Sequence, residues 1–354
     1  MKPAVKPSMD VASLLADEKK ATHLRWLRRA AWVHVVLLVL VWTVMLWWGD
    51  VWWPGTLLMY GPRWVVIAPL LLLLAIAREK SRKLLLPVLI AVVILLFPIL
   101  GTNVPVTHLL SHDNDDPARL RIVTFNAQGG KIRHAAWQAY LRKVRPDVVL
   151  CQEWPPETTR PDLWKENWHV EVVGNILLFA SRYPLGKLHL ITDVELRARG
   201  FVAAGDVQTP FGPVTMANVH LPTMRGQAGE ADEVVHGKLS SLKDLDAIAE
   251  RRLVASRFTR DWLTTFTGPM IVAGDFNLTP DSRIYSEAWS KFHNAFSTAG
   301  WGWGQTKWTR WYGVRIDHIL HDSAWKCMQV AVGPDVGSDH LPLMAELVFT
   351  GGGR

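Results

Sequence analysis

The stretch "VAGDFNLTPDS" (272–282) places a carboxylate and a carboxamide two residues apart at the end of an apolar run. Successive strand residues point to opposite faces, so Asp275 and Asn277 should project in the same direction from the strand end. Taken alone, the pair is explained by an Asx turn that closes the strand. It gains weight because the same pattern recurs elsewhere in the chain.

Five further apolar runs carry such polar residues: Asn126 in "VTFNAQ", Glu153 in "VLCQEW", His220 in "ANVHLP", Asp317 in "RIDHIL" and Asp339-His340 in "GSDHLP". Each has an ordinary explanation by itself, as a turn residue, a solvated strand end or a histidine satisfied by its neighbours. Gathered in one place, ionised carboxylates repel and raise one another's pKa values. A divalent cation resolves that repulsion, and oxygen ligands favour Mg²⁺ or Mn²⁺ over zinc. The pattern therefore predicts a metal-assisted site at strand ends.

The elements that must position these residues are short, strand-like apolar runs. They begin near Arg119 and continue to residue 349, and several are continuously apolar, as in strands buried on both faces. Residues 135–144 and 241–266 have apolar residues at helical spacing. Many strands with few helices predict two stacked sheets flanked by helices. We expect a linker at 101–118 and an irregular, mobile loop at 224–240.

The strongest apolar runs lie before this region, at residues 30–48, 56–77 and 84–100. The first carries no charged residue and would form about 28 Å of helix, close to the hydrocarbon thickness of a bilayer. Buried core helices of a soluble fold are the alternative, but three such runs leave no polar face. A cleaved signal peptide would be shorter and begin earlier. The pattern therefore predicts three transmembrane helices within residues 30–100.

Charge predicts the orientation of these helices. Lys and Arg gather before the first run and in "REKSRK" (78–83), whereas the segment between the first two runs has only Asp50 and "HDNDD" (112–116) has only acids. The positive-inside rule then places residues 1–29 in the cytoplasm and the region after Leu100 on the periplasmic or extracellular side. We expect the membrane to be a bacterial inner membrane.

The basic balance of the chain belongs to the membrane region. Residues 1–104 hold 12 Lys and Arg against 5 Asp and Glu, whereas residues 105–354 hold 27 of each. Residues 105–354 thus lack the bulk positive charge of a protein that binds nucleic-acid duplexes nonspecifically. Cys151 and Cys327 make no disulfide framework, and we expect two buried, unpaired thiols rather than one bridge.

Six motifs in this order, "TFNAQG", "CQEW", "NVHLP", "GDFNLTPDS", "RIDHIL" and "GSDHLPL", resemble the endonuclease/exonuclease/phosphatase (deoxyribonuclease-like) superfamily. The resemblance covers about residues 119–349 and implies a four-layer α/β/β/α sandwich, here preceded by the membrane helices. It implies a metal-dependent phosphoesterase with a catalytic domain at 119–350. One departure is Gln128, where abasic-site repair enzymes of the superfamily often carry an acid, which argues against a repair nuclease.

The resemblance also implies roles for the strand-end residues. Glu153 is expected to be the main Mg²⁺ (or Mn²⁺) ligand, with Asn126 and Asp339 helping to hold the metal or its waters. Asp275 would orient and deprotonate the attacking water, while Asn277 would donate to the phosphoryl oxygen. His340, oriented by Asp317, would contact the phosphate or carry a proton, and His220 would stabilise the transition state or protonate the leaving group. The sequence leaves open which histidine is acid and which is base.

The substrate is indicated only by residues 299–317, "AGWGWGQTKWTRWYGVRID", which combine four Trp with Lys307, Arg310 and Arg315. Core packing, a lipid headgroup layer and stacking on single-stranded nucleic acid all fit this composition. Our first hypothesis is a membrane-anchored phosphodiesterase or phosphatase that acts outside the cytoplasm, with the bilayer as partner and a lipid headgroup as candidate substrate. A tethered nuclease acting on external DNA or RNA is the alternative, less favoured given the neutral outer region. A catalytically dead phosphate-binding module is the third.

Overall fold

The computed structural model describes residues 11–76, 82–106, 119–155, 164, 167–196, 200–223 and 242–351. Part of the expected linker, the expected loop at 224–240 and most of "REKSRK" lie outside the described residues. The chain divides into two units, one formed by residues 1–43 and 63–100 and the other by residues 44–62 and 101–354. Each is described by itself.

The N-terminal unit is helical. It contains most of α1 (Val11–Trp48), the 3₁₀ turn η1 (Arg63–Ile67), α3 (Ala68–Ile76), α4 (Arg82–Ile94) and the π-helical turn η2 (Leu95–Ile99). Leu27 and Ala31 of α1 pack against Leu84 of α4, and the Arg63 guanidinium donates to the Ile99 carbonyl at 3.0 Å. Many of the remaining apolar side chains of this unit are exposed.

Among the described residues, only the first of the three predicted transmembrane segments forms one unbroken helix of membrane-spanning length, and its place in a membrane stays a prediction. Within the described residues one helix, Leu14–Trp48, is long and apolar enough to span a membrane. The second run passes that test only as a broken pair, because Gly61 and Pro62 separate α2 (Trp53–Tyr60) from η1 and α3. The third forms a shorter apolar helix, Leu84–Ile99, which contains Pro87 and Pro98.

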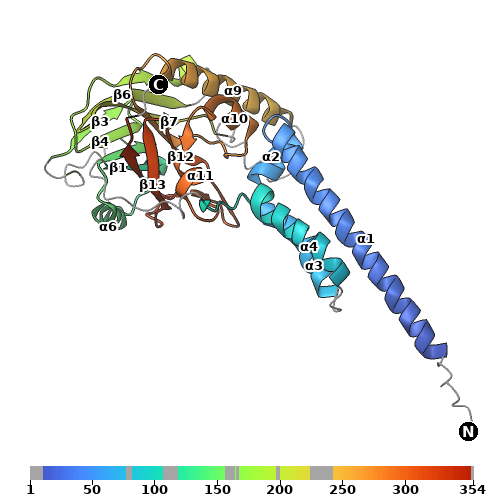
Figure 1. Cartoon of the computed structure of the whole chain (residues 1–354). Helices are drawn as coiled ribbons and strands as arrows, with labels where there is room; N and C mark the ends of the chain where they lie inside the picture. Colours follow the sequence, from blue (N-terminus) through green and yellow to red (C-terminus); the bar gives the residue numbers. More distant parts are fainter. Residues whose placement is uncertain are drawn as a thin grey trace, which may run out of the picture. The chain divides into compact units, whose positions relative to one another are not determined.

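The second unit, residues 44–62 and 101–354, carries the candidate site residues and is called the catalytic unit below. It is built on two six-stranded mixed sheets (Figure 1). The first has the order β13-β14-β1-β2-β4-β3, with β1 (Arg119–Asn126), β2 (Val148–Gln152), β3 (His169–Val173), β4 (Leu177–Ser181), β13 (Trp325–Val332) and β14 (Leu343–Phe349). The second has the order β5-β6-β7-β8-β12-β9, with β5 (His189–Ile191), β6 (Phe201–Thr209), β7 (Gly212–His220), β8 (Met270–Asp275), β9 (His293–Asn294) and β12 (Asp317–His321). A separate pair joins β10 (Lys307–Trp308) to β11 (Gly313–Val314).

Three apolar clusters define the layers. One lies between the sheets and joins side chains such as Ile122 and Phe179 to Ile271 and Ile319. A second packs the first sheet against α6 (His134–Val144). A third packs the other sheet against α9 (Leu242–Leu263), α7 (Asp193–Leu196) and α10 (Arg283–Trp289). The short α11 (Ala295–Ala299) contributes to the cluster between the sheets. The predicted pair of stacked sheets flanked by helices is thus confirmed, with α6 and α9 far apart on the unit (Figure 1).

Local sequence explains where the expected strands differ. The run at 170–181 is a hairpin, because Gly174 and Asn175 adopt left-handed φ values of 60° and 57° and turn the chain between β3 and β4. The run at 188–196 continues as a strand only to Ile191 and then forms α7. Both cysteines are buried and unpaired, as expected.

The segment 44–62 groups with the catalytic unit, although it includes the end of the first apolar run and the start of the second. Asp50 is fully buried and its carboxylate accepts from the Ser282 hydroxyl and from the Ile284 N–H, at the start of α10. A carboxylate is stabilised there because the first N–H groups of a helix lack partners within it. Helix α2 contacts α9.

Candidate active site

Two parallel strand pairs, one in each sheet, bring the site together. Parallel β1 and β2 align Asn126 with Gln152, directly before Glu153, and parallel β7 and β8 align His220 with Asp275. Parallel neighbours end at the same sheet edge, so side chains far apart in sequence become adjacent. Stacking of the two sheets then joins the two edges.

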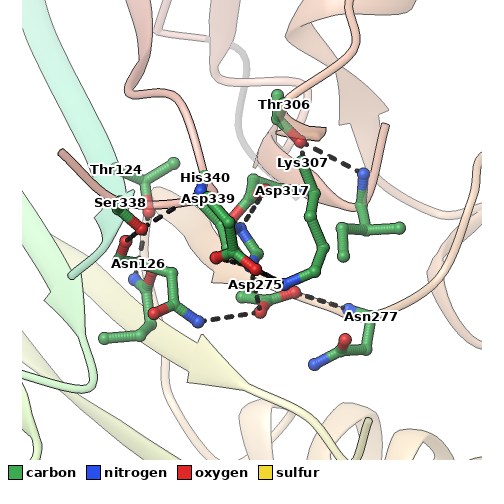
Figure 2. A network of polar contacts seen from close by, with 12 residues as sticks. Thr124, Asn126, Asp275, Asn277, Thr306, Lys307, Asp317, Ser338, Asp339 and His340 are labelled. Atoms are coloured by element: carbon green, nitrogen blue, oxygen red, sulfur yellow. Dashed lines mark hydrogen bonds and ion pairs between the residues drawn. The ribbon is translucent and has the colours of Figure 1, made fainter. Parts of the chain in front are cut away.

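Asp275 lies at the centre of the site and is almost completely buried. Its Oδ2 accepts from Asn126 Nδ2 at 3.0 Å and lies 3.7 Å from His340 Nε2 (Figure 2). The same oxygen lies 3.9 Å from His220 Nε2. Burial, followed by the charge of Asp317, raises the pKa of Asp275. A carboxylate with a raised pKa is suited to accept a proton.

Asn277 is held in place by the turn that follows β8. Its N–H donates to Asp275 Oδ1 at 2.9 Å, and its side-chain amide donates to the Leu221 carbonyl at 2.9 Å. Strand β8 needs Gly274 directly before Asp275, because a Cβ there would lie 1.9 Å from the Val219 carbonyl oxygen of the neighbouring β7. Asn277 itself has a left-handed φ of 52°, and Glu153 has one of 51°. Such values are uncommon outside glycine and persist where the surroundings fix them.

His340 and Asp317 form a buried pair. Nδ1 of His340 lies 2.9 Å and 3.0 Å from the two carboxylate oxygens of Asp317 (Figure 2). Burial alone would lower the pKa of His340, but the Asp317 and Asp275 carboxylates outweigh it and raise the pKa. Burial alone would raise the pKa of Asp317, but the charge of His340 and its hydrogen bond lower it. The two carboxylates therefore favour the protonated form of His340, whereas the Lys307 ammonium, 2.8 Å from His340 Nε2, opposes it and lowers its pKa. The same Nε2 lies 3.7 Å from Asp275 Oδ2.

Asn126 bridges the two sheets. Its Nδ2 donates to Glu153 Oε1 and to Asp275 Oδ2, each at 3.0 Å, and its Oδ1 accepts from the Gln128 N–H at 2.9 Å. His220 Nε2 lies 3.5 Å from the same Glu153 oxygen. In this arrangement Asn126 orients the two carboxylates with its amide nitrogen, and its predicted part in holding the metal would be through a water or a rotated amide.

Asp339 completes the set of predicted metal-holding residues. Its Oδ2 lies 3.0 Å from Lys307 Nζ, whereas its buried Oδ1 has no hydrogen-bond partner. Oδ1 also lies 3.9 Å from His340 Nε2, beyond hydrogen-bond distance. A buried carboxylate oxygen that lacks a hydrogen bond fits a cation ligand, because a buried polar atom left without a partner is costly. Together with Glu153, whose side chain is about one-third exposed at 35%, it offers the hard oxygen donors that Mg²⁺ and Mn²⁺ prefer. The residues present therefore fit a divalent ion.

Among the described residues, ligand atoms of Asp275, Asp317 and His340 also lie within 4.8 Å of one another, close enough to hold an ion. That group is less suited to Mg²⁺, because His340 Nδ1 and Asp317 already satisfy each other and nitrogen ligands favour other metals. The assignment of the metal to Glu153 and Asp339 therefore stays a prediction.

All eight predicted site residues thus lie in one connected network, which Asn277 joins through its backbone N–H while its side-chain amide donates to the Leu221 carbonyl. Their roles remain predictions. The sequence had not placed four further residues in the site: Lys307, Thr306, Ser338 and Gln128. Tertiary contacts bring these four residues to the site. The sequence marks Lys307 only as one of three basic residues among the tryptophans of residues 299–317.

Lys307 is the most notable of these. Its Nζ lies 2.8 Å from His340 Nε2 as well as beside Asp339 (Figure 2). The strand β10 that carries it runs alongside the Asp339–Leu341 segment, with Trp308 N–H donating to the Asp339 carbonyl at 2.8 Å. Thr306 receives the N–H groups of Ile316 and Asp317 on its hydroxyl, and Ser338 donates to the Asn126 carbonyl. Gln128 Oε1 accepts from the Asp339 N–H at 3.2 Å.

The backbone behind Asn277 is supported from outside the core motifs. The buried Arg252 guanidinium of α9 donates to the Asn277 carbonyl and, at 2.7 Å, to the Tyr60 hydroxyl. The Tyr60 hydroxyl lies 3.4 Å from the same carbonyl. Tyr60, which lies within the second apolar run, therefore takes part in fixing the turn that carries Asn277.

Two stacked mixed sheets that bring carboxylates, amides and two histidines to one shared edge define an α/β sandwich whose site is suited to phosphoester hydrolysis. The chain belongs to the Endonuclease/Exonuclease/phosphatase family, whose model matches residues 123–340. This confirms the resemblance found in the motifs. The comparison with curated proteins gave no match.

Solved structures show the same fold at low sequence identity. The human Nocturnin catalytic domain with bound sulfate is 17% identical, with a TM-score of 0.50 over 69% of this chain and 98% of that one. A truncated TDP2 from Caenorhabditis elegans is 15% identical, with a TM-score of 0.50 over 65% and 98%. A family protein from Bacteroides thetaiotaomicron is 14% identical, with a TM-score of 0.50 over 66% and 96%. At these identities the likeness concerns the fold alone.

Proposed function

We propose that this chain is a membrane-anchored, Mg²⁺-dependent phosphoesterase that hydrolyses a phosphodiester or phosphomonoester outside the cytoplasm. The observation that carries the proposal is the buried Asp275, which is contacted by Asn126 and faces His220 and His340. Family membership supports a phosphoester or nucleic-acid substrate. The anchor is supported by the apolar helix Leu14–Trp48.

The divalent ion, when bound by Glu153 and Asp339, would withdraw charge from a nonbridging phosphoryl oxygen and steady the leaving oxygen. Asp275 would orient a water and take its proton as the new bond to phosphorus forms. Asn277 would donate its second amide N–H to a phosphoryl oxygen. As the bond from phosphorus to the leaving oxygen breaks, one of the two histidines would give that oxygen a proton.

Lys307 places a positive charge beside His340 Nε2, which faces Asp275. Fixed cations aimed at the position where charge develops stabilise the transition state of phosphoryl transfer. Lys307 would therefore contact a nonbridging oxygen, once the substrate displaces its present contact with His340.

A substrate panel tests the proposal. The full chain in nanodiscs is incubated with p-nitrophenyl phosphate, bis(p-nitrophenyl) phosphate, a single-stranded oligonucleotide and phosphatidic acid, with Mg²⁺, Mn²⁺ or EDTA. The proposal expects hydrolysis of at least one ester with either metal and none with EDTA, and Asp275→Asn serves as the inactive control. Absence of turnover on every ester with both metals would instead identify a phosphate-binding module.

A nuclease is the second candidate, and the exposed tryptophans of residues 301–311 with Arg310 favour it. Oligonucleotide cleavage far more efficient than hydrolysis of the other esters, with steep salt dependence, would select it.

The predicted orientation needs its own test. A reporter enzyme fused after Arg354 should be active only in the external compartment, and a cytoplasmic signal would reverse the topology.

A further inference from the structure

The exposed tryptophans of the catalytic unit are concentrated beside the site. Trp301, Trp303, Trp308 and Trp311 are 61%, 50%, 47% and 71% exposed. Every other tryptophan described between residues 101 and 351 is buried or half-buried. Core packing therefore does not explain this stretch, called here the tryptophan segment (301–311). Large exposed aromatic groups gathered in one place mark an interaction surface.

The tryptophan segment is also part of the wall of the site. Neighbouring residues of β10 point in opposite directions, so Lys307 reaches His340 and Asp339 while Trp308 is exposed. Trp311 follows in the turn to β11, with the Arg310 guanidinium 5.1 Å from its ring centroid. Whatever binds these indoles is thereby held next to the catalytic residues.

The segment is tied to residues that closely follow an apolar run. The Trp303 indole donates to the Thr102 hydroxyl at 2.9 Å, and the backbones of Gly302 and Asn103 exchange hydrogen bonds at 2.8 and 3.0 Å. The Asn103 amide donates to the carbonyls of Phe296 and Gly300. The apolar run ends at Leu100, three residues earlier, and three residues of chain reach at most about 11 Å.

A second tie lies at the other end of the apolar region. Asp50, two residues after the end of α1, is buried against the start of α10, and Tyr60 binds Arg252. Trp47, Trp48, Trp52 and Trp53 in this stretch are exposed as well. If the apolar helices span a bilayer, both tied segments lie at its surface.

We propose that the tryptophan segment docks into the headgroup layer of the bilayer that holds the apolar helices, so that the site takes a phosphoester carried by a lipid. This rests on the proposed function and names its substrate class. Indole rings are enriched at membrane interfaces because they combine an apolar body with one N–H donor. A neutral catalytic region, with 27 acids and 27 bases over residues 105–354, favours this surface over a polynucleotide.

Site-directed labelling tests the docking without relying on activity. Cys151 and Cys327 are buried, and burial raises the pKa of Cys327 to about 12, so an introduced exposed cysteine reacts selectively with a maleimide. The full chain carrying Trp311→Cys is labelled with an environment-sensitive fluorophore and placed in nanodiscs that contain doxyl lipids. Val194→Cys is the matched control, because Val194 is 80% exposed and lies on the α7 side of the same unit.

We expect strong quenching at position 311 and little at 194. Equal, weak quenching at both positions would overturn the docking, even if the enzyme hydrolyses soluble esters. Loss of all hydrolysis would count against the proposed function while leaving the quenching result intact.

Substrate choice gives the second arm. Trp301→Ser with Trp311→Ser should raise the KM for phosphatidic acid in nanodiscs by about tenfold and leave hydrolysis of p-nitrophenyl phosphate unchanged. An equal loss on both substrates would show a structural effect and contradict the lipid assignment. A selective loss on the oligonucleotide would transfer the surface to nucleic acid.

Discussion

The first sheet, β13-β14-β1-β2-β4-β3, and the second, β5-β6-β7-β8-β12-β9, have the same number of strands and each contains one parallel pair. Their chemistry differs. The first sheet and its loops provide the predicted metal-holding residues, Asn126, Glu153 and Asp339. The second sheet and its loops provide the predicted proton-transfer and phosphate-binding residues, which are His220, Asp275, Asn277 and Asp317. His340 belongs to the loop before β14 of the first sheet, yet its imidazole pairs with Asp317 of the second.

Because the predicted roles are divided between the two sheets, the proposed reaction requires the two sheet edges to lie at one fixed distance. A buried polar tie sets it: Gln152 Nε2 donates to Asn218 Oδ1 at 2.7 Å, and Asn218 Nδ2 donates to the carbonyls of Cys151 and Leu178 at 3.0 Å. Such bonds within an apolar interface specify one arrangement, because any shift would leave buried polar groups unpaired.

The largest expected effect comes from the second sheet. Asp275→Asn removes the proton acceptor and should reduce kcat by about 10³-fold, with thermal unfolding close to that of the wild type. A rate within a few-fold of the wild type would show that the base lies elsewhere.

The corresponding change in the first sheet is Glu153→Gln. It should reduce activity at fixed Mg²⁺ by about 100-fold, chiefly by weakening metal binding. Raising Mg²⁺ should restore part of the rate, and the thermal shift produced by Mg²⁺ should shrink. A variant with an unchanged Mg²⁺ titration would remove Glu153 from the metal site, and Asp275→Asn is the matched control, since its metal response should persist.

Asp317→Asn probes the contact that crosses between the sheets. The charge of Asp317 raises the pKa values of Asp275 and His340. Because Asp275 must be ionised to act, activity falls as the pH drops through its raised pKa. Removing Asp317 lowers that pKa, so the acid limb of the pH–rate profile should move to lower pH. A shift toward higher pH, or none, would contradict this coupling.

Asn218→Leu breaks the buried tie and should destabilise the catalytic unit by about 1–3 kcal/mol, since it leaves the Cys151 and Leu178 carbonyls without their donor. Thermal unfolding of the detergent-solubilised full chain measures this. Gln152→Leu in the same background should cost less than it does alone, as a double-mutant cycle of coupled residues requires. Strict additivity would show that the two amides act independently.

Tyr60→Phe is the mildest test. Arg252 still holds the Asn277 carbonyl, so kcat should fall only by a few-fold, with KM unchanged for a soluble ester. Arg252→Met should lower kcat more than Tyr60→Phe does. Equal, unaltered rates in both would show that the Asn277 turn needs no outside support.

The sequence by itself determined which residue types end the apolar strands, because strand burial follows from local patterns of apolar residues. Those residue types in turn identified the family and the eight residues expected in the site. The sequence also determined the first apolar helix from a long uncharged run. The broken second run shows the limit of hydropathy, since Gly61 and Pro62 override composition.

Only the tertiary structure decided what the strand ends do together. Lys307 enters the site because β10 runs beside Asp339 and His340, and Arg252 and Tyr60 support Asn277 because α9 and residue 60 pack behind its turn. No sequence period or motif predicts these contacts, because Arg252 lies 25 residues from Asn277 and more than 190 residues from Tyr60.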